Sequence, residues 1–314
     1  MARNSFLKSS RIKDSKDIDM SDKIRKKTFP SAQEDRKAAE LFVESSQTLS
    51  PSYRLAYIDQ DFIVRDELRP VRLQLELMKP EILFEKHEID ATVVIFGSTR
   101  IPDPAVAKEV MEAALKEVGK DPQNPMLAQK LKIAARLVEK SAYYEEARRL
   151  SRIISENCRD SKDCRPFIMT GGGSGIMEAA NRGAHDAGTE SIGLNIVLPH
   201  EQKPNSYITP ELCFQFHYFA IRKMHFLMRA RALVAFPGGF GTMDELFETL
   251  TLIQTKKIQP IPILLFGREF WEKAIGFDFL VEEGVISQED PNIFQYVETA
   301  EEAWEIIRKA HLAD

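Results

Sequence analysis

The chain has 314 residues, of which 43% are hydrophobic and 29% are charged, and its formal net charge is -5 at pH 7. This composition predicts a soluble globular protein with a sizeable core and argues against a nucleic-acid partner, because binding nucleic acid needs clustered Lys and Arg. No apolar run approaches the roughly 18 residues of a membrane span and no signal-peptide core is present, so we expect a cytoplasmic protein without a membrane partner.

The first 30 residues carry nine Lys or Arg against four Asp. This bias predicts that residues 1–37 form a disordered basic tail. Residues 38–90 are predicted to form an N-terminal helical extension, since Val71, Leu75 and Met78 follow helical spacing. The leucines around them also alternate as they do in a strand, so this segment is open to both interpretations.

From residue 91 to residue 314 the pattern is regular. Apolar, β-rich runs alternate with helical patterns, which predicts a Rossmann-like α/β domain with a doubly wound parallel sheet. The predicted strands are Thr92–Phe96, Pro166–Thr170, Ser191–Leu198, Cys213–His217, Ala232–Phe236, Ile261–Phe266 and Ile293–Val297. The charged, alanine-rich stretch between Arg100 and Ser141 predicts a helical insert after the first strand.

The three cysteines are Cys158, Cys164 and Cys213. Their odd number and their spacing predict reduced thiols, with no disulfide and no cysteine-bound metal.

Glycines are concentrated where the second and fifth predicted strands end, in TGGGSGIME and PGGFGTMDE. Ligands of such sheets bind beyond the carboxyl ends of the strands. The amides of a glycine-rich turn before a helix can cradle a phosphate, although a tight turn with a helix cap would use the same residues. The predicted ligand-binding residues in these loops and in FGSTR, after the first strand, are Ser98, Gly172, Gly173, Gly238, Gly239, Phe240, Gly241 and Thr242.

A carboxylate and a cationic pair accompany the second glycine loop. Thr242 and Glu245 fit a capping box, which would place Glu245 in the first turn of a helix, where the helix dipole favours the ionised carboxylate. Arg222 and Lys223 open the predicted helix Phe219–Arg231, which begins at the same edge of the sheet. Arg222 and Glu245 are therefore a candidate catalytic pair, with a salt bridge and a helix cap as the alternatives.

Two nucleotide-binding patterns and one nucleophile motif are missing. The chain has no GxxxxGK[ST] loop, no acidic ribose partner for GGGSG and no GxSxG elbow. These absences leave a nucleoside monophosphate, bound by its phosphate, as the expected ligand.

PGGFGTMDE, an RK pair fifteen residues before it, and TGGGSGIMEAANRGAHDAG resemble the Lonely Guy family over about Ala91 to Leu312. Its members are cytokinin riboside 5′-monophosphate phosphoribohydrolases, often mislabelled lysine decarboxylases. The resemblance implies hydrolysis of the N-glycosidic bond of an adenine nucleotide, which releases the free base and ribose 5-phosphate. It also implies no pyridoxal phosphate, no metal and no other cofactor, and a homodimer or homotetramer.

Carried over by position, the resemblance makes Arg222 and Glu245 catalytic. It makes Lys223, Gly239 to Thr242 and Thr251 substrate-binding. The chain has FAIRK where short members typically show MHxRK, and it carries the insert, so AMP or another purine nucleotide is an alternative to a cytokinin nucleotide. A non-catalytic nucleotide or molybdenum-cofactor carrier is a second hypothesis.

Overall fold

The computed structural model describes residues 29–157, 166–199 and 203–311. It divides into two compact units, Met1–Arg69 and Pro70–Asp314. Most of the predicted basic tail, together with Cys158 and Cys164, lies outside the described residues. Where the tail is described the prediction was wrong, because helix α1 (Ala32–Ala39) begins five residues before its predicted end at residue 37.

The first unit contains short helical elements. Ser31 accepts a hydrogen bond from the Glu34 amide and the Glu34 side chain accepts one from the Ser31 amide, which is a complete capping box for α1. The other elements are η2 (Pro51–Tyr53), α2 (Gln60–Ile63) and η3 (Asp66–Leu68). None of the hydrophobic side chains described between residues 29 and 69 is buried. In isolation this unit has local caps but no hydrophobic core.

The second unit is built on a seven-stranded sheet in the order β4-β3-β2-β1-β5-β6-β7, with every pair of neighbours parallel. The strands are β1 (Thr92–Phe96), β2 (Phe167–Thr170), β3 (Ser191–Ile196), β4 (Cys213–Phe216), β5 (Ala230–Ala235), β6 (Ile263–Phe266) and β7 (Phe294–Val297). The predicted fold class and all seven predicted strands are confirmed. From β1 the chain first adds β2, β3 and β4 on one side and then β5, β6 and β7 on the other, so the strand order reverses between β1 and β5.

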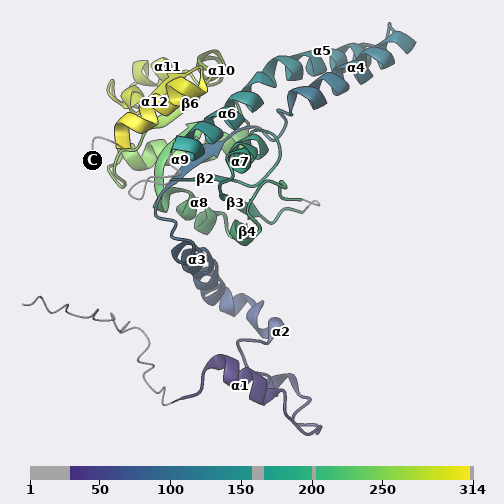
Figure 1. Ribbon diagram of the computed structural model, residues 1–314, viewed down its shortest axis with the longest axis vertical. Helices are drawn as coiled ribbons and strands as arrows, with labels where there is room; N and C mark the ends of the chain where they lie inside the picture. The colour runs from purple at the N-terminus through teal and green to yellow at the C-terminus, as the bar shows by residue number, and fades with distance from the viewer. Residues whose placement is uncertain (1–28, 158–165, 200–202, 312–314) are drawn as a thin grey trace, which may run out of the picture. The chain divides into compact units, whose positions relative to one another are not determined.

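Helices cover both faces of this sheet (Figure 1). The helices that follow or connect the strands are α6 (Ala142–Asn157), α7 (Ile176–Asp186), α8 (Phe219–Met228), α9 (Phe240–Gln254), α10 (Arg268–Ala274), α11 (Phe277–Glu282) and α12 (Ala300–His311), with the short turns η4 (Pro210–Leu212) and η5 (Asp290–Ile293). None of the helices in the described ranges is long and apolar enough to cross a membrane.

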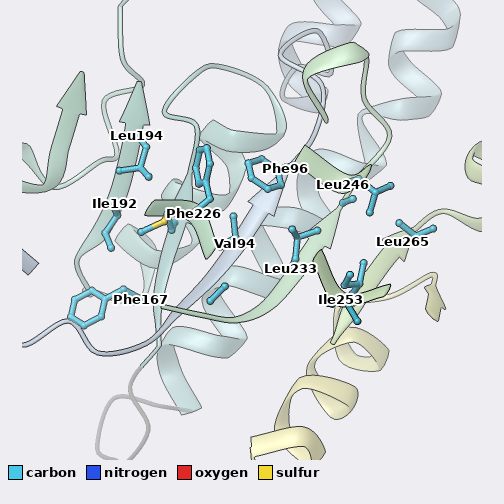
Figure 2. Close-up of a cluster of buried hydrophobic side chains, with 14 of the residues drawn as sticks. Val94, Phe96, Phe167, Ile192, Leu194, Phe226, Leu233, Leu246, Ile253 and Leu265 are labelled. Atoms are coloured by element: carbon cyan, nitrogen blue, oxygen red, sulfur yellow. The ribbon is translucent and has the colours of Figure 1, made fainter. Parts of the chain in front are cut away.

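Two hydrophobic clusters fill the space between the sheet and these helices. Val94 and Phe96 of β1 belong to the cluster shared with α8 and α9, whereas Val93 and Ile95 face the cluster shared with α6, α7 and α12. This division follows from the alternation of side chains along a strand. Figure 2 shows the first cluster, in which Phe226 of α8 lies among residues of β1, β3 and β5. The core therefore fixes α8 and α9 against the sheet.

The predicted helical insert is a pair of helices, α4 (Pro104–Lys120) and α5 (Pro125–Lys140). Each begins with a proline after a capping residue, because Asp103 accepts from the Ala105 amide and Asn124 accepts from the Met126 amide. The two helices run side by side and extend away from the sheet (Figure 1). The insert thus has its own start signals and leaves the sheet undisturbed.

Helix α3 (Arg69–Lys86) precedes β1 and confirms the helical interpretation of this segment. Its buried residues are Pro80 and Phe84, while Val71, Leu75 and Met78 are exposed, so the regular apolar face lies on the outside. Glu76 of α3 accepts hydrogen bonds from the amides of His217, at 2.8 Å, and Tyr218, at 3.1 Å, just before α8. This carboxylate satisfies backbone amides at the start of α8 and fixes α8 to α3.

Replacing Glu76 by Ala should lower the free energy of unfolding by about 1 to 2 kcal/mol, because two amides at a helix start lose a charged acceptor. Urea denaturation of Glu76→Ala and of the parent measures this difference. Glu85→Ala, at an exposed position of the same helix, is the matched control and should change stability by less than about 0.5 kcal/mol. Equal losses in the two variants would contradict a capping role for Glu76.

Candidate functional site

A cavity of about 690 Å³ opens where the sheet reverses its strand order. Its walls come from the loop after β1, the loop after β5, the first turns of α9, and side chains of α5, α7, α8 and α10. The predicted site residues that line it are Ser98, Arg222, Gly238, Gly239, Phe240, Gly241, Thr242 and Glu245. The topology therefore brings the candidate catalytic pair together with Ser98 and the loop PGGFGTMDE.

The amide end of α9 forms one wall of the cavity. Gly239 is its N-cap and no side chain caps it, so Phe240, Gly241 and Thr242 occupy the first turn, whose amides have no partner within the helix. The predicted capping box was wrong, because the helix begins at Phe240, two residues before Thr242. The site therefore presents backbone donors and the positive end of a helix dipole to the cavity, as an anion requires.

The three glycines of this loop have different roles. A β-carbon at Gly238 would lie 2.1 Å from Oγ1 of Thr242, so the buried Thr242 side chain needs glycine there. At Gly239 and Gly241 a β-carbon would meet no described atom within 4 Å. These two glycines are not required by packing inside the chain; they leave open space above the amides of α9.

Glu245 lies in the second turn of α9 and is only 7% exposed. Burial raises the pKa of its carboxyl group to about 7, although Lys223 and Arg222 act in the opposite direction. The expected position in the first turn of the helix was therefore wrong, and burial, not the helix dipole, has the largest effect on this pKa. A carboxyl group with a pKa near neutrality is instead suited to proton transfer.

Arg222 reaches the cavity from α8. Its Nε donates to the carbonyl oxygen of Leu194 at 2.8 Å, and its guanidinium carbon lies 5.1 Å from the ring centre of Phe226. Burial lowers the pKa of Arg222, and the negative charges of Glu245 and Asp244 oppose this shift. The guanidinium and the Glu245 carboxyl group are thus partly desolvated within each other's field.

A glycine of the loop after β2, TGGGSGIME, makes room for this arginine. A β-carbon at Gly171 would lie 2.8 Å from Nη2 of Arg222 and 2.9 Å from Sδ of Met177. The sequence interpretation chose the next two glycines, Gly172 and Gly173, which do not line the cavity. The signal for Gly171 was present in the same motif but needed the position of Arg222 to be recognised.

Gly172 and Gly173 are held in a polar network instead. The carbonyl oxygens of both glycines accept from Nδ2 of Asn205, at 3.3 and 3.0 Å, and Nδ2 also contacts Oδ1 of Asn181 at 3.0 Å. Gly172 has φ of 76°, and a β-carbon there would lie 2.3 Å from Oδ1 of Asn195. These contacts fix the shape of the loop. Predicting them requires the pairing of segments far apart in the sequence.

Lys223 and Thr251 also lie outside the cavity. Nζ of Lys223 contacts carboxylate oxygens of Asp244 and Glu248, each at 2.9 Å. Burial acts to lower the pKa of Lys223, but these hydrogen bonds outweigh it and leave the pKa above its usual value. Thr251 is exposed and donates to the carbonyl oxygen of Phe247 within α9. Within the chain as described, Lys223 supports α9 and Thr251 has no contact with the cavity.

Other residues line the cavity without having been singled out from the sequence. They are Arg100, Ile101, Leu137, Lys140, Met177, Phe219, Asp244 and Phe270, among others. Arg100 and Met177 belong to the motifs FGSTR and TGGGSGIME, so the sequence contained a signal for both. Leu137 and Lys140 belong to the insert, and no sequence pattern connects them with the site. Among the described residues, no group of three or more His, Cys, Asp or Glu is arranged to hold a metal ion.

Comparison with known proteins gives one matching family model, described as "Possible lysine decarboxylase", over residues 177–307. Cytokinin riboside 5′-monophosphate phosphoribohydrolase LOG7 of Arabidopsis thaliana is 30% identical over 176 residues, which cover 54% of this chain and 75% of that protein. The enzyme of the same name, LOG, of Oryza sativa subsp. japonica is 30% identical over 168 residues, covering 52% of this chain and 65% of that protein.

Solved structures with a similar arrangement include the molybdenum cofactor carrier protein of Chlamydomonas reinhardtii, with 21% identity and a TM-score of 0.38 over 55% of this chain and 89% of that one. Another is the molybdenum cofactor binding protein of Rippkaea orientalis, with 19% identity and a TM-score of 0.37 over 53% and 86% of the two chains. These scores are too low to carry a functional argument. The sequence match that covers three quarters of a LOG phosphoribohydrolase, together with the residues gathered in the cavity, leads to one statement: the chain belongs to the Lonely Guy (LOG) family.

Proposed function

We propose that this protein hydrolyses the N-glycosidic bond of a purine nucleoside 5′-monophosphate, either AMP or a cytokinin riboside monophosphate, and releases the free base and ribose 5-phosphate. The observation that carries the proposal is that Arg222 and Glu245 line one cavity with the uncapped amide end of α9. The cavity, at about 690 Å³, is within the size range of small-molecule sites. The names of the LOG relatives support the same reaction.

In this proposal the 5′-phosphate binds the amides of Phe240, Gly241 and Thr242. Because these donors are fixed in the backbone, they position the ribose before the reaction. The phosphate then acts as the handle by which the enzyme holds the reacting end of the sugar.

Cleavage breaks the bond between C1′ and the base nitrogen; the electron pair leaves with the nitrogen, which takes up a proton from solvent, and positive charge builds on the ribose ring. The ionised carboxylate of Glu245 stabilises this charge and accepts a proton from the water that adds to C1′, as carboxylates do in glycoside hydrolysis. Arg222 lines the same cavity, and its positive charge favours the ionised form of Glu245. A carboxyl group whose pKa is raised to about 7 is a stronger base than an exposed one.

The direct test is to incubate the purified protein with AMP and assay free adenine, with adenosine as the comparison substrate. If the phosphate is the anchor, adenosine should be turned over at least about 100-fold less efficiently, since it lacks the contacts to the α9 amides. Equal turnover of the two would reject the phosphate anchor. Binding of AMP without any adenine release would favour the alternative of a nucleotide carrier.

Glu245→Gln keeps the size and burial of the side chain but removes its charge. Turnover of AMP should fall by about 100-fold or more, the scale for loss of one positioned acid-base or electrostatic group. AMP binding should survive, because its main contacts are backbone amides. A variant that releases adenine at the parent's rate would remove Glu245 from the mechanism. Glu139→Gln, on an exposed site of α5, is the matched control.

The pH dependence of stability in the parent and in Glu245→Gln gives a second test. The pKa of Glu245 is about 7 in the folded state and 4.5 in its reference state, so its stabilising contribution is complete below pH 4.5 and is lost as the pH rises through 7. Between pH 4.5 and pH 8 the parent should therefore lose up to about 3 kcal/mol that Glu245→Gln does not lose. Between pH 5 and pH 8 the melting temperature of the parent should therefore fall relative to that of Glu245→Gln.

The proposal includes a homodimer or homotetramer. Met224 and Met228 lie one turn apart on α8 with exposures of 48% and 49%. With Leu227 and Leu252 they line a hollow of about 890 Å³ beside the site. An apolar surface of this kind on α8 is suited to a second subunit.

Light scattering at micromolar concentration should give at least twice the chain mass of 35.8 kDa. The double variant Met224→Asp, Met228→Asp should shift the protein towards monomer, because two buried carboxylates would be unpaired in the interface. Met126→Asp, at an exposed position of α5, is the control. A parent protein that is monomeric under these conditions contradicts this part of the proposal.

A further inference from the structure

Lys140 is the last residue of the helical insert and lines the cavity together with Leu137. Its Nζ lies 5.8 Å from the ring centre of Phe270, which is also part of the wall. Arg100, in the loop after β1, lines the same cavity. Among the described residues neither Lys140 nor Arg100 forms an ion pair, whereas Lys223 nearby is held by two carboxylates. The cavity wall thus has two cations that are available to a ligand.

The root of the insert is fixed to the body of the domain. Nη1 of Arg182, on α7, contacts Oδ2 of Asp103 at 2.9 Å and the hydroxyl oxygen of Tyr144 at 3.5 Å. Asp103 precedes the insert and Tyr144 follows it, so one arginine holds both ends. Tyr143 packs edge-on against Phe266, with ring centres 6.1 Å apart. Lys140 lies three and four residues before these anchored tyrosines, so its backbone is fixed near the cavity.

The charge balance of the phosphate site calls for such cations. A phosphate monoester carries about -1.5 to -2 charges at pH 7, whereas a helix N-terminus supplies only about half a positive charge. Arg222 is already engaged with Leu194 and lies in the field of Glu245. Two further cations in the same cavity supply the charge that the backbone donors lack.

We propose that Lys140, carried by the insert, binds the phosphate of the substrate together with Arg100 and the amide end of α9. This inference rests on the proposed function for the identity of the anion as a nucleotide 5′-phosphate. The family model matches residues 177–307, so the insert lies outside the part of the chain that it covers. The insert is in this way a part of the binding site and not only an addition to the surface.

The probe is ribose 5-phosphate, whose binding can be measured by calorimetry without any turnover. Lys140→Met keeps the aliphatic length and removes the charge; it should weaken ribose 5-phosphate binding about tenfold, the effect of losing one charged hydrogen bond. Lys140→Arg should retain most of the affinity. Lys132→Met is the matched control, since Lys132 is exposed on the same helix and does not line the cavity; it should bind as the parent does. Rising salt should weaken the parent more steeply than Lys140→Met.

With AMP as substrate, Lys140→Met should raise KM about tenfold and leave kcat nearly unchanged, because the contact is the same in the ground and transition states. Parent-like affinity of Lys140→Met for ribose 5-phosphate, or no binding by the parent itself, would overturn the inference. If the parent binds ribose 5-phosphate through Lys140 but releases no adenine, the hydrolase proposal fails and the phosphate site stands. Equal losses in Lys140→Met and Lys132→Met would also contradict a specific role for Lys140.

Discussion

The site depends on how closely three loops approach one another at Ser98. The amide of Ser98 donates to the carbonyl oxygen of Pro237 at 3.0 Å, and its own carbonyl oxygen accepts from the amide of Ile176 at 3.1 Å. The loops after β1, β2 and β5 are thereby joined through the backbone of a single residue. Gly175 permits this approach, since a β-carbon there would lie 2.3 Å from the Ser98 carbonyl oxygen. Because these are backbone contacts, the floor of the cavity is set before any side chain is placed.

Charge burial is the second constraint on this arrangement. Arg222 and Glu245 come from consecutive helices that the core holds against one face of the sheet. Each is partly desolvated, and each shifts the pKa of the other towards its ionised form against the effect of burial. Such a pair does little for stability, since desolvation offsets most of the attraction. Two buried ionisable groups with shifted pKa values that line one cavity are the arrangement expected of a candidate functional site.

Much of the sheet could be predicted from the sequence because parallel strands buried on both faces are short, continuous apolar runs. The position of Arg222 and Glu245 at one cavity could also be predicted, since it follows from the common edge at which parallel strands end. The start of α9 could not, because Thr242 and Glu245 match the spacing of a capping box although Gly239 is the N-cap. The roles of Gly172 and Gly173 depend on Asn205, a partner more than 30 residues away. Local patterns carry no information about such a contact.

The anchoring of the insert by Arg182 has a consequence for how this protein could change during evolution. Since Asp103 and Tyr144 contact the same guanidinium, the chain leaves the domain and returns to it at nearly one point. A hairpin with such closely joined ends can be lengthened, shortened or exchanged at little conformational cost to the rest of the domain, because loop-closure entropy changes slowly with length. Its far end is free to drift in sequence while its root stays beside the cavity. New ligand preferences could then be acquired by recombination of a peripheral hairpin, without altering the strands, the glycine loop, Arg222 or Glu245.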